Sequence, residues 1–140
     1  MPTSTAEATW DGALIDGEGT VALGSDAYEG PYSFASRFES GDGTNPEELI
    51  GAAEAGCYAM AFANMLDEEG YSPERVHAEA AVTLNADDLE ITTVELTVEA
   101  TVPDVGTEAF HDVADQAKEG CPVSKALAGT DIQLDATLQD

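Results

Sequence analysis

The chain has 140 residues, 43% of them hydrophobic, and this length suits one domain with a modest core. We therefore expect residues 1–140 to form a single domain. The chain carries 29 acidic and only 4 basic side chains, for a formal net charge of -25 at pH 7. A surface of this charge repels phosphate backbones and anionic lipids, which argues against nucleic acid and membrane surfaces as partners.

The acidic side chains are distributed singly and in pairs among apolar segments. This distribution indicates a folded core beneath an acidic coat rather than a disordered chain. Because such self-repulsion needs screening, we expect a high-salt cytoplasm, as in halophiles. The first ten residues lack the basic start and apolar run of a secretion signal, so we predict a cytoplasmic protein.

The N-terminal third has the pattern of short strands. Residues 5–23 alternate loosely between apolar and polar side chains, with glycines between them as turn signals, and this predicts a hairpin. Residues 31–38 (PYSFASRF) are expected to form a third strand, with Arg37 near its end among aromatic side chains.

Residues 44–70 form the longest predicted element, a helix. Asn45 can cap it, Pro46 suits its first position, and Gly70 suits the left-handed turn that ends a helix. Its side chains are apolar on nearly every face, which predicts a buried helix. The run is long enough to span a membrane, but Glu54 and Asn64 interrupt it and no basic residue flanks it, so a core helix is favoured.

The second half alternates strands and helices. Two long strands are predicted at 75–84 and 90–102, joined by a turn, and a last strand at 131–138. Helices are predicted at 107–119, with Thr107 as cap and Gly120 as stop, and at 122–127. The chain is thus of the α+β class. Because a sheet covers only one face of the central helix, we predict a homodimer with paired central helices.

Cys57 and Cys121 are the only cysteines. There is no CxxC motif, and two histidines without matching spacing do not make a zinc site. An intracellular cysteine pair is more often catalytic or simply buried than a structural disulfide. Cys121, before Pro122, is either an accessible thiol at a helix start or a buried cap residue. The two cysteines form a redox pair if the fold brings them together, which their spacing does not settle.

Cys57 lies in mid-helix, where burial raises the pKa of a thiol and leaves it inert unless a positive group lies nearby. Arg37 is the main candidate among the four basic residues, because an aromatic setting makes an unpaired guanidinium costly. Glu47, near a helix start, is a candidate partner for it. The alternative is that Arg37 is a surface residue paired with one of the many acids.

Four stretches carry a resemblance to a known family. TNPEELIGAAEAGCYAMAFA and KEGCPVSKAL resemble the two signature stretches of the osmotically inducible protein C and organic hydroperoxide resistance (OsmC/Ohr) family. TWDGALIDGEGTV and YSFASRFE resemble its OsmC branch in particular. The resemblance covers nearly the whole chain. It implies an OsmC-like α+β fold with a long central helix, and an intertwined homodimer with sites at the subunit interface.

The resemblance also implies a thiol-dependent peroxidase for organic hydroperoxides and hydrogen peroxide, with no metal or organic cofactor. By motif, Cys57 resembles the peroxidatic cysteine and Cys121 the resolving one. Arg37 resembles the arginine that holds the thiolate, and Glu47 the glutamate that orients that arginine. An external dithiol, lipoyl-type or thioredoxin-like, would regenerate the thiols.

The chain departs from the pattern of the family that it resembles at two places. Glu54 stands where relatives often carry a histidine, and this acid is expected to raise the pKa of the nearby thiol. The loop Leu14 to Gly19 lacks the arginine of the hydroperoxide-resistance branch, so Arg37 must serve alone.

One geometric point restricts the site. Glu47 and Cys57 are ten positions apart, which is roughly 15 Å along a continuous helix. Either the helix breaks near Gly51 or Gly56, or the Arg37–Glu47 pair and the two cysteines of one site come from different subunits. We hypothesise the second arrangement.

Two other functions compete with the peroxidase. A non-enzymatic small-ligand or lipid-binding module with an apolar dimer cleft predicts that Cys57→Ser leaves function intact. Cysteine-dependent acyl transfer needs a base beside Cys57, and only His77 and His111 are available. For the peroxidase, apolar side chains near Cys57 would favour bulky alkyl peroxides, and the candidates are Tyr58, Met60 and Phe62 with Phe34 or Phe38.

Overall fold

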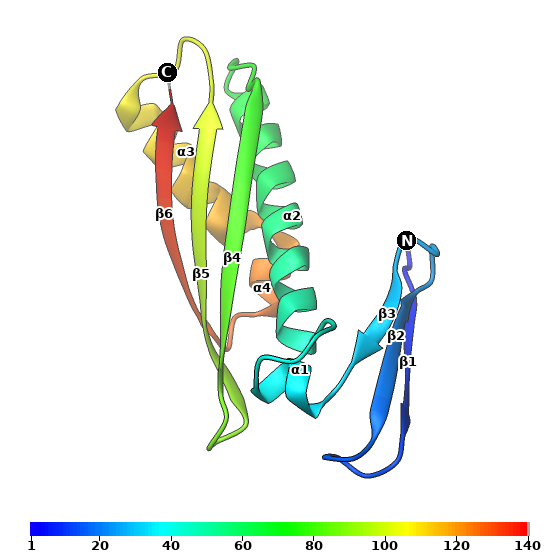
Figure 1. The fold of residues 1–140 in the computed structure, drawn as a ribbon. Coiled ribbons are helices and arrows are strands. Elements are labelled where there is room, and N and C mark those ends of the chain that lie inside the picture. The colour runs from blue at the N-terminus through cyan, green and yellow to red at the C-terminus, as the bar shows by residue number, and fades with distance from the viewer. Residues whose placement is uncertain (140) are drawn as a thin grey trace. The chain divides into compact units, whose positions relative to one another are not determined.

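A computed structural model of the chain describes residues 1–139 and contains two compact units, Met1–Leu49 and Ile50–Asp140 (Figure 1). The long helix α2, Pro46–Glu68, begins in the first unit and continues through the second. That residues 1–140 form a single domain stays a prediction.

The first unit contains a three-stranded antiparallel sheet in the order β1-β2-β3. The strands are β1 (Ala6–Asp11), β2 (Glu18–Leu23) and β3 (Glu29–Tyr32), and the first two form the predicted hairpin. Trp10 and Tyr32 both pair with Gly19, one from each side, and their rings lie 5.4 Å apart. A Cβ at Gly19 would lie within 3 Å of both rings, so only glycine allows this aromatic pair.

The predicted strand over residues 31–38 is wrong beyond Tyr32, where the chain turns into the short helix α1, Phe34–Phe38. Two serines cause the change. Ser36 N–H donates to Ser33 Oγ over 3.0 Å, and Ser33 N–H donates to Ser36 Oγ over 2.8 Å. This reciprocal capping box starts a helix where the alternating aromatic residues predicted a strand. Arg37 therefore lies in the last turn of a helix.

Helix α2 has the predicted ends. Glu48 N–H donates to Asn45 Oδ1 over 2.7 Å, which confirms Asn45 as the cap. Gly70, with a φ of 92°, adopts the left-handed conformation that follows the last turn. Between these ends the helix is continuous from Pro46 to Glu68, so it does not break at Gly51 or Gly56.

The second unit contains a mixed sheet in the order β4-β5-β6. β4 (Arg75–Asn85) and β5 (Glu90–Thr101) are antiparallel, whereas β6 (Asp131–Gln139) runs parallel to β5. The crossover between β5 and β6 contains α3 (Thr107–Gly120) and α4 (Pro122–Ala126). These elements confirm the predicted order. The cap of α3 is Gly106 rather than Thr107, and Gly120 is its last residue rather than its stop.

The core of the second unit lies on one face of this sheet. Alternate residues of β5 point into it, and helices α2 and α3 cover the same face (Figure 1). The Tyr58 hydroxyl of α2 donates to the Ala114 carbonyl of α3 over 3.0 Å, which satisfies a buried polar atom between the two helices. The opposite face is exposed and contains part of the predicted acidic coat, namely Glu79, Glu95, Glu99, Asp131 and Asp135.

A single chain covers only one stripe of α2. The buried positions lie three or four residues apart and are Glu47, Gly51, Glu54, Tyr58, Phe62 and Leu66. The helix is long and apolar enough to cross a membrane by length and composition, a test that a core helix also passes. Because three of its large side chains are completely buried in the core with α3 and the sheet, we interpret α2 as a core helix.

The alternation along β5 gives the first prediction. Leu96 is 1% exposed and its neighbour Thr97 faces solvent. Leu96→Ala should lower the free energy of unfolding by about 2–5 kcal/mol, since it removes buried methyl groups and leaves a cavity. Thr97→Ala should change it by less than about 0.5 kcal/mol. Equal losses for both variants in chemical denaturation would contradict the assignment of the core to this face.

Candidate redox site

The structure places the two cysteines in contact. Cys57 lies in the fourth turn of α2, and Cys121 links the end of α3 to the start of α4. Both are free thiols, and the Cys57 and Cys121 sulfur atoms lie 2.7 Å apart. A side-chain rearrangement without movement of whole elements would therefore let the two sulfurs form a disulfide.

The exposure of the two thiols differs. Cys121 is completely buried, which settles the alternatives for this residue in favour of a buried cap. It is buried because it joins two helices: its N–H donates to the Ala117 carbonyl of α3, and its own carbonyl accepts from Lys125 N–H of α4. Cys57 is partly exposed. An attacking molecule therefore meets the sulfur of Cys57 before that of Cys121.

The surroundings of Cys57 within the second unit make it a poor thiolate. Its pKa is raised above the usual value, chiefly by burial and next by the neighbouring Cys121 thiol. The Glu54 carboxylate raises it further, as predicted from the sequence, whereas a hydrogen bond from the Val123 N–H lowers it. No basic group contributes to this balance among the described residues. A reactive Cys57 needs a cation beyond these neighbours.

A second polar contact lies one helical turn from the sulfurs. Glu54, three residues before Cys57, is completely buried, and its Oε1 accepts a hydrogen bond from Ser124 Oγ over 2.6 Å. Its other oxygen, Oε2, is buried and has no hydrogen-bond partner among the described residues. Sequence patterns predicted an acid near the thiol but not this pairing, because Ser124 lies 70 positions away in the chain.

Arg37 and Glu47 form the predicted ion pair in the first unit. Arg37 Nε lies 3.1 Å from Glu47 Oε1, and Nη2 lies 3.0 Å from Oε2, so the pair is bidentate. The Arg37 side chain is 37% exposed and that of Glu47 8%. The planar fork fixes the orientation of the guanidinium while part of it remains accessible.

Short polar contacts hold this ion pair in place. Ser36, in α1, donates from its hydroxyl to the Thr44 carbonyl over 2.7 Å, and its own carbonyl accepts from Asn45 Nδ2 over 2.9 Å. These bonds attach α1 to Thr44 and Asn45, the two residues directly before α2. Arg37 comes directly after Ser36, and Glu47 comes two residues after Asn45, so these bonds from side chains to backbone carbonyls position both members of the ion pair.

An apolar groove of about 310 Å³ lies beside Arg37 in the first unit. Phe34 and Phe38 line it, as two of the predicted pocket residues, and the Arg37 guanidinium lies 5.4 Å from the Phe38 ring centre. The sequence missed the other lining side chains, Trp10, Leu14 and Tyr32, which come from the hairpin and the end of β3. The candidates Tyr58 and Phe62 belong to the core of the second unit and do not line this groove.

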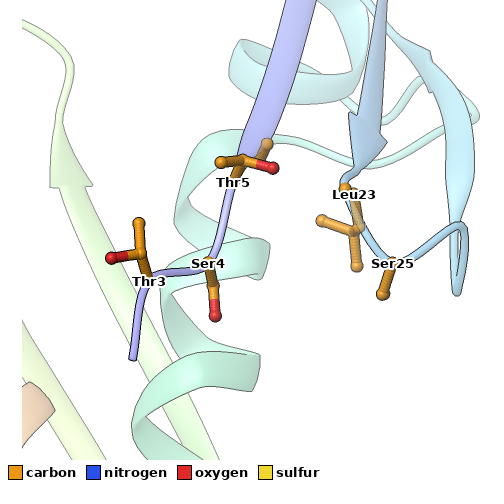
Figure 2. Close-up of a pocket in the computed structure, with 7 residues that line it drawn as sticks. Thr3, Ser4, Thr5, Leu23 and Ser25 are labelled. Carbon is orange, nitrogen blue, oxygen red and sulfur yellow. The ribbon is translucent and has the colours of Figure 1, made fainter. Parts of the chain in front are cut away.

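Other features of the described residues do not point to chemistry. A larger hollow of about 560 Å³ lies between the N-terminal segment and the end of β2, and Figure 2 shows that hydroxyl and apolar side chains line it. No group of three or more potential metal ligands occurs in residues 1–139. His77 and His111 are exposed, on β4 and α3, and neither contributes to the surroundings of Cys57.

Two neighbouring thiols at a helix junction of an α+β fold define a two-cysteine redox protein. The family model described as OsmC-like protein matches residues 39–135, which include both cysteines, Glu47 and Glu54. The chain belongs to the OsmC-like protein family.

Known relatives agree with this assignment. The chain is 42% identical over 136 residues to "Peroxiredoxin OsmC" of Escherichia coli (strain K12), covering 95% of this chain and 94% of that protein. It is 29% identical over 103 residues to "Organic hydroperoxide resistance protein-like 2" of Staphylococcus epidermidis, covering 72% of each. A crystal structure of an OsmC-like protein from Mycoplasma pneumoniae matches with a TM-score of 0.75 at 15% identity over 99% of both chains, a likeness of fold.

The second prediction concerns Glu54 and the thiol. Because the carboxylate disfavours the thiolate, Glu54→Gln should lower the pKa of Cys57. Thiolate absorbance against pH, measured in the Cys121→Ser background, isolates the titration of Cys57. Asp67→Asn, an exposed acid on α2, is the control and should leave this pKa unchanged. A Cys57 pKa that stays constant or rises in Glu54→Gln would contradict the assigned effect.

Proposed function

We propose that this protein is a cysteine-based peroxidase of stress defence that reduces organic hydroperoxides, and hydrogen peroxide as well, through a two-cysteine cycle. The 2.7 Å contact between Cys57 and Cys121 is the observation that carries the proposal. The names of the E. coli and S. epidermidis relatives support both the chemistry and the substrate class.

In the first step the thiolate of Cys57 attacks an oxygen of the peroxide. An S–O bond forms, the O–O bond breaks, and the alkoxide takes up a proton and leaves as an alcohol. The sulfur is oxidised by two electrons to a sulfenic acid. Cys57 is the attacking residue because it is partly exposed, whereas Cys121 is buried.

In the second step Cys121 attacks the sulfenic sulfur of Cys57. An S–S bond forms, the S–O bond breaks, and hydroxide leaves with the thiol proton as water. An external dithiol then returns two electrons by thiol–disulfide exchange. We expect a lipoyl-type or thioredoxin-like reductant in the cytoplasm, and neither a metal nor an organic cofactor takes part in this sequence.

Arg37 supplies the cation that Cys57 lacks in its own unit, and Glu47 orients it. Helix α2 is unbroken, so Glu47 and Cys57 of one chain lie roughly 15 Å apart along its axis. We therefore assign Arg37 and Glu47 of one subunit to the Cys57–Cys121 pair of its partner. A guanidinium near the sulfur lowers the pKa of the thiol and stabilises negative charge as the peroxide bond breaks.

The uncovered side of α2 supports an intertwined homodimer. Only 28% of the apolar window of this helix is buried within one chain, and Met60 is 76% exposed. Exposed neighbours on the same side are small, namely Ala52, Ala53 and Gly56. Small side chains let two helices approach closely, so a second copy of α2 is the simplest cover for this face.

The groove beside Arg37 suggests which peroxides are preferred. Its aromatic and aliphatic lining suits an alkyl or aryl group, and Arg37 at its edge would hold the polar peroxide end. Organic hydroperoxides should therefore react faster than hydrogen peroxide, which gains nothing from an apolar groove. The same groove supports the second candidate function, a non-enzymatic module that binds small apolar ligands.

Single cysteine variants separate these functions, which gives the third prediction. Cys57→Ser should abolish turnover of cumene hydroperoxide, since no other thiol starts the reaction. Cys121→Ser should still form a sulfenic acid on Cys57, trapped by dimedone and read by mass spectrometry, but no disulfide within one chain. Full turnover by Cys57→Ser would contradict the cysteine mechanism. Absence of turnover in the wild type, together with apolar-ligand binding that Cys57→Ser leaves unchanged, would favour the binding module.

A mixing experiment tests whether the site is shared between subunits and gives the fourth prediction. Cys57→Ser and Arg37→Met homodimers should each be nearly inactive. Unfolding and refolding them together produces mixed dimers, in which Arg37 of one subunit meets Cys57 of the other. Such mixtures should regain about a quarter of the wild-type activity, because half of the dimers carry one complete site. Mixtures that stay inactive, although mixed dimers form, would place both groups of a site in one chain.

A further inference from the structure

Two short segments of the second unit meet at two points. Residues 54–57 are one turn of α2, and residues 121–124 are the start of α4. Cys57 contacts Cys121 through their sulfurs, and Ser124 Oγ donates to Glu54 Oε1. The segments run in opposite directions, because 57 meets 121 and 54 meets 124.

The contact between Ser124 and Glu54 has no part in the two-step chemistry. Glu54 is completely buried and Ser124 is 6% exposed, and their 2.6 Å bond is short. A buried carboxyl without a partner is strongly unfavourable, so Glu54 strongly favours any arrangement that keeps Ser124 against it. The second carboxylate oxygen of Glu54, Oε2, has no hydrogen-bond partner within residues 1–139. Among the described residues, the Glu54 side chain is therefore hydrogen-bonded only to Ser124.

The contact fixes the residue that reacts second. Cys121 and Ser124 are three residues apart, and Cys121 N–H is bonded to α3 while its carbonyl accepts from Lys125. The first turn of α4 is therefore held at one end by α3 and at the other by Glu54. With one contact alone, the first turn of α4 could rotate about that contact. Contacts to α2 at both position 54 and position 57 restrain this rotation and keep the Cys121 sulfur directed at Cys57.

We infer that Glu54 and Ser124 are positioning residues for disulfide formation, acting as a buried clamp that holds Cys121 against Cys57. This inference adds a role to the proposed peroxidase and rests on it for its biological meaning. The quantity that the clamp changes is the effective concentration of the Cys121 thiol at Cys57. This quantity can be measured without peroxide.

The clamp has a chemical consequence. Once Cys57 is a sulfenic acid, it either condenses with Cys121 or reacts with a second peroxide molecule to give the sulfinic acid. Condensation is a reaction between positioned groups and is fast only if the Cys121 sulfur stays within reach. Loss of the clamp should slow condensation and divert a larger fraction of Cys57 to the sulfinic form, while the first oxidation step proceeds.

The test uses four variants of the full chain. Ser124→Ala removes the hydrogen bond but leaves the Glu54 carboxyl buried without a partner, which destabilises the fold. The double variant E54A/S124A removes both polar partners and avoids this cost. Glu54→Gln keeps an amide oxygen that accepts from Ser124 and removes the charge. Val113→Ala, in the buried face of α3, reproduces a loss of stability without touching either segment.

Equilibration with glutathione redox buffers measures the clamp directly, as the ratio of the Cys57–Cys121 disulfide to the dithiol. Ser124→Ala and E54A/S124A should lower this equilibrium constant by about ten-fold, which corresponds to about 1.4 kcal/mol. Glu54→Gln and Val113→Ala should remain within about two-fold of wild type, since a retained hydrogen bond or a distant cavity does not move Cys121.

Oxidation with excess cumene hydroperoxide gives the second readout, the ratio of sulfinic acid to disulfide by mass spectrometry. This ratio should rise several-fold in the two clamp variants and not in Glu54→Gln or Val113→Ala. Clamp variants that match wild type in glutathione overturn the inference. A wild-type protein that forms the disulfide in glutathione buffer but does not react with peroxide would refute the proposed function. The glutathione equilibria of the variants would then still test the clamp.

Discussion

The contact between two sulfur atoms is the constraint on which the rest of the site depends. Cys57 and Cys121 come from helices that the chain connects only through two strands and a further helix, yet their sulfurs lie 2.7 Å apart. The contact exists because α2 and α3 lie on the same face of the β4-β5-β6 sheet, where Tyr58, Phe62 and Phe110 pack together. Burial of these rings brings the end of α3, and with it Cys121, to the middle of α2.

Burial also creates the chemical problem that the site has to solve. The same packing that joins the thiols raises the pKa of Cys57, and Glu54 adds to the rise. In a chain with 29 acidic and 4 basic side chains, positive charge is scarce. The bidentate Arg37–Glu47 pair keeps one guanidinium oriented instead of letting it pair with any nearby acid. We interpret this pair as the supply of positive charge to a thiol in the partner subunit.

Sequence reasoning predicted most of the fold for physical reasons. Caps and glycines fixed the ends of α2, and strict alternation fixed β4, β5 and β6, because these signals act over a few residues. It predicted a strand over residues 33–38, where the chain forms a helix. The two serines that start this helix, Ser33 and Ser36, do not stand out in the sequence as a capping box. The Arg37–Glu47 pair was predictable from the cost of an unpaired guanidinium. The Glu54–Ser124 bond was not, since nothing local links an acid in one helix to a hydroxyl 70 positions later.

The most direct test is to treat the reduced wild-type protein with one equivalent of cumene hydroperoxide and to locate the disulfide that forms. Peptide mapping without reductant should find both thiols consumed and a single disulfide between Cys57 and Cys121 of the same chain. Recovery of both free thiols, or a disulfide only between Cys57 residues of two chains, would contradict the proposed two-cysteine cycle.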